Sequence, residues 1–555
     1  MHTRLPQLLA IYEYTCAYSH LANVIVAIQF QIVGPRHSVE EEFVEEEELV
    51  LVDGFLKIFT NEDGSVYFLK LDEEDLNKEF LYFTYVMNAP QGSTLTGGLP
   101  SNGKVLEFRN FKKDKIGLYQ INTSYINGDP DNNIAKSSIT NITEAFVEVF
   151  KPSARTDNSV LINVNSILLS EKMDSISYIP SEYREYVSVD YGRPDESKTF
   201  VNNLLNNDTN TAFEVTFAFE NIMPNSDAFS VSAVTDPRYL SVTGRHIFIK
   251  MPDDQFETRV NDHRVGYFVN KSTDLTSYDN FPNFALINKW RLIKKDPNAE
   301  MSEPEEPIVF WVENTTPEEI IPAVVAGIEN WNLAFEEAGF INAVVAKIQP
   351  KDAEWDAADY DYNVVRWSSE PDGNLLGIGP SVSNPLTGEI ISADVVNKLL
   401  AVKVGYNYRK LYGYTEDNDP LMQYITNLTL HEVGHVLGLR HNFRGSYLYS
   451  PAEIHNKDIT GKTLMSSVMD YDPINVAPEG TEQGIYFSTV PGVYDKWAIK
   501  FGYTPGLTDK ERTEILRQSV KRELSFGTDE EAMSSPGYNI DPRTKRYDMS
   551  NDPIT

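Results

Sequence analysis

The stretch TLHEVGHVLGLRHNF, residues 429–443, constrains the fold of this chain more than any other segment. It holds three of the nine histidines within eleven residues, at intervals of four and then six. On an α-helix, a residue four positions further on lies about 40° around the axis and one turn up. His431 and His435 would therefore project side by side and reach one ion. Glu432 is angled away from that ion and can reach a water molecule beside it.

Gly438, in the six-residue interval, determines whether the third histidine, His441, can bind the same ion. If the helix continued, His441 would lie about 240° around the axis and about 9 Å beyond His435, too far to share the ion. Gly438 can adopt the left-handed conformation that ends helices and lets the chain turn back. Upstream, Asp419 and Pro420 have the character of an N-cap and a first helical residue. We therefore predict a helix that starts there and stops inside the interval, so that the last histidine returns to the ion.

This spacing predicts a catalytic zinc site. Three neutral imidazoles leave one of the four positions on zinc open for water, whose pKa the ion lowers from about 16 to about 7. Glu432 would accept the proton of that water and pass it to the departing amine. The alternative is a set of core histidines on a buried helix. The full pattern H-E-x-x-H-x-x-G-x-x-H, at the end of an independently predicted helix, favours the metal site.

The composition narrows the partners and the kind of metal site. The formal net charge of −34 and the pI of about 4.6 disfavour binding to phosphate backbones and anionic lipid headgroups, so we expect no nucleic-acid partner. Cys16 is the only cysteine, which excludes an intrachain disulfide and cysteine-based zinc sites. The apolar run at 21–34 is too short to span a bilayer comfortably, and we expect no membrane span.

The character of the sequence changes several times along its length, and the fold class that it predicts is α+β. The first 48 residues contain the apolar run, which has no convincing signal-peptide context, and an acidic run, EEEFVEEEE. Short alternating segments such as SVYFLKL and EFLYFTYVM then predict strands. After Pro307 strands alternate with helices, including an amphipathic helix over 317–340. The predicted divisions are an unstructured or leader-like arm at 1–48, a β-rich domain at 49–245, a connecting segment at 246–304, a domain with the histidines at 305–500 and a C-terminal region at 501–555.

A second motif, SSVMDY, places Met469 at 28 residues past His441. Together with the long histidine motif it resembles the metzincin signature. Further segments, among them RVNDHRVGYF, NWNLAFEEAGF and SSVMDYDPIN, look like the large bacterial zinc-dependent metalloproteases of the metzincin clan. Those proteins place a poorly characterised β-rich domain ahead of the protease domain, and the resemblance covers about residues 49–555.

The resemblance implies a metzincin-like catalytic domain, built from a twisted mixed sheet and a long active-site helix, after the β-rich domain. It implies one catalytic Zn²⁺ ion held by the three histidines, with Glu432 as general base. Met469 would form an apolar floor beneath the ligands without binding the metal. Tyr471 would either approach the metal and stabilise the oxyanion or simply pack. The resemblance also implies a secreted or periplasmic protein, and identifies residues 501–555 as the start of a truncated helical region.

The resemblance further implies where substrate binds. In metzincins an extended substrate lies along the upper edge of the sheet, and GIGPSVSNPLTGEI is similar to that edge strand and the turn after it. A peptide would bind there by adding a strand through backbone hydrogen bonds. The candidate substrate-binding residues are Gly377, Ile378, Gly379, Pro380, Ser381, Val382 and Ser383.

The sequence thus predicts a zinc-dependent endopeptidase whose partner is a protein or peptide substrate. A second hypothesis is a zinc-stabilised binding or scaffold protein that has lost catalysis. The presence of Glu432 and Gly438 weighs against it, since structural zinc sites usually close all four positions. A third hypothesis is a zinc hydrolase of non-peptide acyl substrates, which the zinc chemistry permits but which the edge strand fits less well.

Overall fold

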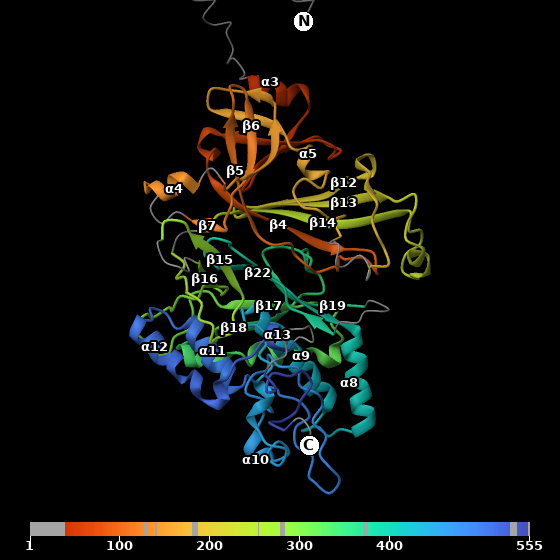
Figure 1. The fold of residues 1–555 in the computed structure, drawn as a ribbon. Helices are drawn as coiled ribbons and strands as arrows, with labels where there is room; N and C mark the ends of the chain where they lie inside the picture. The colour runs from red at the N-terminus through yellow and green to blue at the C-terminus, as the bar shows by residue number, and fades with distance from the viewer. Residues whose placement is uncertain are drawn as a thin grey trace, which may run out of the picture.

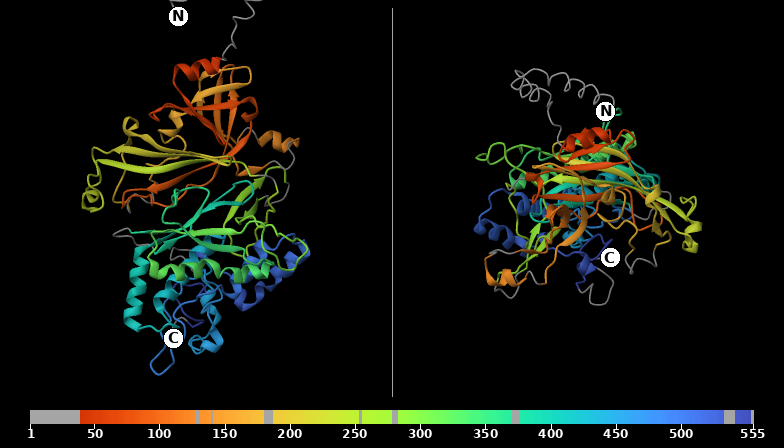
Figure 2. Two further views of the ribbon diagram at one scale, coloured as in Figure 1. Left: turned by 180° about the vertical axis from the view of Figure 1, so that it is seen from behind. Right: turned by 90° about the horizontal axis from the view of Figure 1, so that it is seen from above.

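The chain folds into a β-rich N-terminal half stacked on a C-terminal half that mixes helices and sheets (Figure 1). The view from behind shows the same stacking (Figure 2). The predicted leader-like segment, up to residue 38, lies outside the described residues. The computed structural model describes residues 39–126, 131–138, 141–179, 187–252, 255–277, 283–369, 376–532 and 541–552.

Two antiparallel sheets form the β-rich half. The strands of the larger sheet are β4 (Glu79–Asn88), β5 (Lys104–Phe111), β6 (Lys115–Gln120), β8 (Ala145–Phe150), β11 (Arg193–Pro194), β12 (Phe200–Asn206), β13 (Asn210–Glu220) and β14 (Tyr239–Lys250). Those of the smaller sheet are β1 (Val50–Val52), β2 (Lys57–Thr60), β3 (Tyr67–Asp72), β9 (Pro152–Arg155) and β10 (Ser159–Asn163). The larger sheet has the order β11-β13-β14-β4-β5-β6-β8, with β12 also paired to β13, and the smaller has the order β1-β2-β3-β10-β9. Apolar residues of both sheets, such as Leu69 and Tyr82, meet in one buried cluster.

The N-terminal region is β-rich, as the sequence predicts, and its last strand extends beyond the predicted limit at residue 245. β14 continues to Lys250 instead of ending at residue 245, because it remains paired with β4 through Lys250↔Phe80. The acidic run, which we expected to be unstructured, forms α3 (Val39–Glu46). The ring of Phe43 in α3 packs edge-on against Phe68, with centroids 5.4 Å apart, and so gives this charged helix an apolar contact.

A five-stranded sheet forms the frame of the C-terminal half. Its strands are β17 (Ile308–Val312), β18 (Val344–Ile348), β19 (Asn363–Ser368), β20 (Gly377–Ile378) and β23 (Val395–Lys398). Their order in space is β18-β17-β19-β23-β20, and β20 runs antiparallel to its neighbour while the other pairs are parallel. Beside this sheet lies the two-stranded pair β21 (Ser381–Ser383) and β22 (Ile390–Ala393). The sheet is therefore mixed, and within the described residues β20 is an edge strand.

The helices of the C-terminal half lie below this sheet in Figure 1, on the side away from the β-rich half. They are α6 (Ile321–Glu329), α7 (Asn332–Phe335), α8 (Leu399–Tyr412), α9 (Pro420–Val436), α10 (Lys457–Thr460), α11 (Val493–Tyr503), α12 (Asp509–Arg517) and α13 (Asp529–Ala532). The single helix predicted over 317–340 is instead divided into α6 and α7. The division falls at Asn330, whose side-chain amide donates a hydrogen bond to the carbonyl of Thr489 at 2.8 Å. In the part of the chain that the structure describes, no helix is long and apolar enough to cross a membrane.

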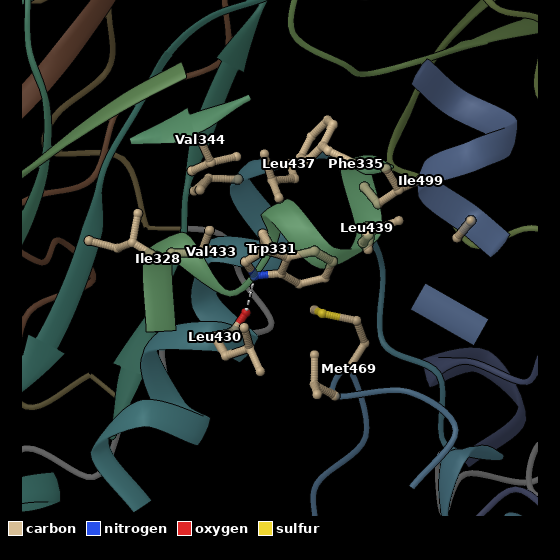
Figure 3. Packing of buried hydrophobic residues seen from close by; sticks show 14 of the residues in the cluster. Ile328, Trp331, Phe335, Val344, Leu430, Val433, Leu437, Leu439, Met469 and Ile499 are labelled. Atoms are coloured by element: carbon tan, nitrogen blue, oxygen red, sulfur yellow. Dashed lines mark hydrogen bonds between the residues drawn. The ribbon is translucent and has the colours of Figure 1, made fainter. Parts of the chain in front are cut away.

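The long helix α9 is packed from its inner side by α6 and the residues after it. A Cβ added at Gly327 of α6 would lie 2.6 Å from the Cβ of Thr429, so the two helices cross at backbone distance. Trp331 is fully buried, and its indole N–H donates to the carbonyl of Leu430 at 2.9 Å (Figure 3). Met469 lies against the same indole. This packing fixes the position of α9 relative to the sheet.

The connecting segment is an integral part of both halves. Its strands β15 (Val269–Asp274) and β16 (Asn283–Ile287) pair with each other, and β15 also pairs in parallel with β7 (Tyr125–Ile126) of the β-rich half. Tyr267 and Ile287 are buried in the same hydrophobic core as α9. The segment therefore joins the two halves by strand pairing as well as by covalent linkage.

The C-terminal region also belongs to the half that carries the histidines. The predicted boundary at residue 500 falls inside α11, so the helix continues across it. Leu516 of α12 and Leu524 after it are buried in the same core as α9. These apolar contacts explain why the region packs back on the motif instead of starting a separate unit.

Candidate metal centre

The helix that carries the histidine motif begins and ends as the sequence predicts. α9 starts at Pro420, and the Asp419 carboxylate accepts a hydrogen bond from the first turn at 3.0 Å. It ends at Val436, whose carbonyl accepts from the indole N–H of Trp290 at 2.7 Å. The hydroxyl of Tyr503 donates to the next carbonyl at 2.8 Å. Side chains therefore bond the last carbonyls of the helix, which have no partner within it.

The chain reverses at Gly438, which has a φ of +97°. Its N–H donates to the carbonyl of His435 at 2.9 Å, and its carbonyl accepts from the N–H of Phe268 at 2.8 Å. A Cβ at this position would lie 2.0 Å from the carbonyl oxygen of Asn288. Glycine is therefore required by the left-handed backbone and also by the close approach of the connecting segment.

The reversal brings three histidines together. One ligand atom from each of His431, His435 and His441 lies within 4.8 Å of the others, and the Nε2 atoms of His435 and His441 are 3.2 Å apart. Among the residues that the structure describes, this is the one cluster of three or more His, Cys, Asp or Glu side chains that could hold a metal ion. The cluster points to zinc binding.

The two helical histidines are held through their Nδ1 atoms. Nδ1 of His431 donates to the carbonyl of Val468 at 2.7 Å, and Nδ1 of His435 donates to the carbonyl of Leu439 at 2.8 Å. A carbonyl oxygen only accepts hydrogen bonds, so the proton lies on Nδ1 and the lone pair of Nε2 is free for a metal. Metal-binding histidines typically use their second nitrogen in this way.

The third histidine is oriented by a carboxylate that sequence reasoning missed. Nδ1 of His441 lies 3.0 Å and 3.1 Å from the two carboxylate oxygens of Asp529, the first residue of α13. Two guanidinium groups flank this carboxylate, that of Arg440 at 3.7 Å and that of Arg546 at 3.8 Å. Asp529 lies 88 residues after His441, and no spacing in the sequence links the two.

Burial keeps two of the histidines neutral. Desolvation lowers the pKa of His435 to about 3 and that of His431 well below its ordinary range, and the neighbouring imidazoles lower both further. Zinc binds the neutral form of imidazole. The protonation states, the free Nε2 atoms and the all-nitrogen donor set therefore fit a zinc ion.

Glu432 is buried where α9 meets the edge of the sheet. A Cβ at Gly377 would lie 2.7 Å from Oε1 of Glu432, and a Cβ at Gly379 would lie 2.4 Å from its backbone oxygen. Burial raises the pKa of Glu432 to about 8, and a hydrogen bond from the N–H of Gly379 opposes this rise. A divalent cation on the adjacent histidines would favour the charged form and lower this pKa.

Met469 is fully buried beneath the motif. A Cβ at Gly434 would lie 2.2 Å from its Sδ and 2.8 Å from the ring of Trp331. The residue before the second helical histidine is thus a glycine because the sulfur and the indole occupy the space of a side chain. Sequence reasoning did not single out Gly434, since the long motif leaves that position open.

Tyr471 lies beside the histidines. Its ring centroid is 5.4 Å from that of His431 and 4.7 Å from that of His441. Its ring also stacks on that of Tyr547, with centroids 5.7 Å apart. Burial and the nearby carboxylate of Glu432 raise the pKa of Tyr471, so its hydroxyl keeps its proton.

The segment 377–383, predicted as one edge strand, forms two short strands. Residues 377–378 form β20, which pairs with β23, whereas residues 381–383 form β21, which pairs with β22. Pro380 lies between them and has no N–H to continue a ladder. Gly379, directly before it, donates its N–H to Glu432.

Comparison with known proteins gives two family matches. Residues 414–555 match the family described as Met-zincin, and residues 98–295 match a domain of unknown function (DUF5117). No curated protein and no solved structure matches the chain. The Met-zincin match contains all three histidines of the cluster. The resemblance predicted from the sequence is therefore confirmed, and the chain carries a Met-zincin domain of the metzincin zinc-protease type, preceded by a DUF5117 domain.

Proposed function

We propose that the chain is a zinc-dependent endopeptidase with one catalytic Zn²⁺ ion. The observation that carries this proposal is the cluster of His431, His435 and His441, whose ligand atoms lie within 4.8 Å of one another. Three protein ligands leave a fourth position for water or substrate, which distinguishes catalytic from structural zinc sites. The family match supports the same activity, and the resemblance to bacterial metalloproteases supports a secreted or periplasmic location.

The residues around the cluster have separate roles in this proposal. When bound, the ion supplies a Lewis acid that lowers the pKa of water to about 7 and polarises the scissile carbonyl. Glu432 accepts the proton of the attacking water and donates it to the departing amine. Tyr471 donates its hydroxyl proton as a hydrogen bond to the carbonyl oxygen while negative charge develops there. Met469 fills the space beneath α9 and so keeps the ligands in place.

The edge of the sheet provides the surface on which a peptide would lie. β20 is an edge strand within the described residues, and Gly377 and Gly379 bring its backbone directly onto Glu432. An extended peptide would add to residues 377–383 through main-chain hydrogen bonds, which places its carbonyl groups beside the metal centre. Extended peptides suit such a surface better than compact acyl substrates.

Cleavage of a casein or peptide-library substrate tests the proposal. We expect the zinc-loaded chain to cleave peptides, a chelator to abolish cleavage and added zinc to restore it. Glu432→Gln keeps the shape of the side chain but removes the base, so we expect about one bound zinc per chain and at least a hundredfold slower cleavage. Glu416→Gln removes an exposed carboxylate of the same domain and should cleave like the parent.

The other functions predict different results. A zinc-stabilised scaffold would bind zinc, stay folded and cleave no peptide in the library. A hydrolase of non-peptide acyl substrates would cleave members of an ester and amide library but no peptide. Cleavage by Glu432→Gln at the rate of the parent would show that another group is the base.

A further inference from the structure

A cleft lies next to the metal centre, and residues of the β-rich half form part of its wall. It has a volume of about 460 Å³ and lies between the connecting segment and residues 379–383. At one end are Gly379, which donates to Glu432, and Phe268, whose ring centroid is 5.8 Å from that of His435. At the other end are residues 100–103, which connect β4 to β5. The cleft therefore joins the proposed active site to a loop of the DUF5117 domain.

The loop at the far end is held firmly in place. The N–H of Ser101 donates to the carbonyl of Thr84 at 2.7 Å, and the N–H of Thr84 donates to the hydroxyl of Ser101 at 2.9 Å. A Cβ at Gly103 would lie 2.8 Å from the carbonyl oxygen of Ser383. The loop is thus paired with β4 on one side and lies against β21 on the other, as a fixed wall of the cleft.

The junction behind this wall is also fixed. Tyr85 of β4 donates its hydroxyl proton to the buried carboxyl of Asp394, between β22 and β23. Its hydroxyl oxygen accepts from the guanidinium of Arg366 of β19 at 3.0 Å. A Cβ at Gly98 would lie 2.6 Å from the side chain of Val396. The β-rich half is therefore docked on the sheet that contains β20.

The lining of the cleft is uncharged. No described residue that lines it is Asp, Glu, Lys or Arg, although the whole chain has a net charge of −34. The lining consists of backbone, amide and hydroxyl groups with apolar side chains, including Phe268, which is 39% exposed.

We propose that the DUF5117 domain forms part of the substrate site, and that the cleft takes an uncharged extended peptide segment reaching from the metal centre to residues 100–103. This inference rests on the proposed peptidase function and names the substrate class on one side of the cleavage point. Asn102 is exposed at the end of the cleft and sets the side-chain preference there. A charged substrate residue is disfavoured because it would lose hydration in the cleft without gaining a partner.

Two variants of Asn102 test the inference against a peptide library with systematic charge changes. We expect the parent to disfavour Lys, Arg, Asp and Glu at one position at a fixed distance from the cleaved bond. Asn102→Asp should raise the relative kcat/KM for Lys and Arg at that position about fivefold, the size of a partly exposed ion pair. Asn158→Asp, an exposed position of the same half outside the cleft, makes the same chemical change and should leave the preferences unchanged.

Peptide length gives an independent measurement. Asn102→Trp should fill the end of the cleft, and substrates are shortened stepwise from either terminus. We expect kcat/KM to fall for the variant only with substrates long enough to reach the loop, and in only one of the two series. Identical charge and length profiles for the parent and both Asn102 variants would overturn the inference and leave the peptidase proposal standing. A folded, zinc-loaded parent that cleaves nothing would overturn the proposed function and this inference with it.

Discussion

His441, the third histidine of the cluster, is held by the carboxylate of Asp529, and the other two histidines have no such partner at Nδ1. His431 and His435 donate to backbone carbonyls, whereas Nδ1 of His441 faces a carboxylate at 3.0 Å. The negative charge makes the imidazole a stronger donor of electrons to a metal and fixes the orientation of its ring. The metal affinity of the chain therefore depends on α13 as well as on α9.

The substitution Asp529→Asn should weaken zinc binding about tenfold to a hundredfold, the usual effect of losing such a partner. Competition with a chromogenic chelator measures this dissociation constant without reference to activity. Glu530→Gln is the matched control, since Glu530 is the next residue and pairs with Arg440 but not with a histidine. Equal zinc affinity in the two variants would contradict a role of Asp529 in holding the ligand.

At the residue scale, the spacing of residues in the sequence predicted those site residues whose positions are determined by the geometry of one helix. The three histidines, Glu432 and the glycine at the turn follow from periodicity on one helix and its end. Asp529 and Gly434 do not, because their constraints come from contacts with distant residues. Gly434 is fixed by the sulfur of a methionine 35 positions further on, at 2.2 Å from its Cβ position.

The end of α9 is the element on which the metal centre depends. A non-glycine residue in the left-handed backbone conformation costs about 1–2 kcal/mol. Gly438→Ala should lower the stability of the fold by more than this cost. The added Cβ would also lie 2.0 Å from the carbonyl of Asn288, so the reversal itself must shift. We expect a large fall in the thermal unfolding midpoint and loss of zinc.

Gly480→Ala separates the two causes. Gly480 has a φ of +85°, but no atom of the described residues lies within 4 Å of its Cβ position, so its variant carries the backbone cost without the contact. Its unfolding midpoint should fall only slightly, and zinc binding should remain. If Gly438→Ala behaved in the same way, the close approach of the connecting segment would not be a constraint.

Most elements were predictable from their own residues, and the exceptions depend on distant contacts. α9 begins and ends where the sequence predicts, because its capping residue, Asp419, and the glycine after it define these limits locally. The predicted helix over 317–340 is divided at Asn330, which bonds to Thr489. The predicted edge strand is divided at Pro380, and its two parts pair with different strands. The distant residue or strand with which a segment pairs cannot be inferred from the periodicity within that segment.

At the scale of the whole molecule, a buried polar contact joins the two halves. Tyr85 of the β-rich half and Asp394 of the other half are 309 residues apart in the chain. The sequence predicted both halves but not their docking, because neither residue has a local pattern that indicates its partner. Burial raises the pKa of Asp394 to about 7, although hydrogen bonds from Tyr85 and Val364 and the charge of Arg366 oppose the rise.

This junction should make the stability of the chain depend on pH. With a folded-state pKa of about 7 and an ordinary value of 3.8, Asp394 binds a proton in the folded state that the unfolded state has already lost between these values. The free energy of unfolding therefore falls as the pH rises from about 4 to about 7. The contribution is at most about 4 kcal/mol, since each pKa unit corresponds to about 1.4 kcal/mol.

The substitution Asp394→Asn removes this titration while keeping an oxygen that can accept from the N–H of Val364. The difference between the thermal unfolding midpoint of the variant and that of the parent should therefore increase with pH. The variant should be least stable relative to the parent near pH 4 and most stable relative to it near pH 7.5. Asp352→Asn alters an exposed carboxylate, and its difference from the parent should not change over this range. A constant difference for Asp394→Asn would show that the carboxyl is ionised in the fold throughout. Arg366 would then outweigh burial, and the Tyr85 hydroxyl would join the two halves through a hydrogen bond to a charged carboxylate instead of a neutral one.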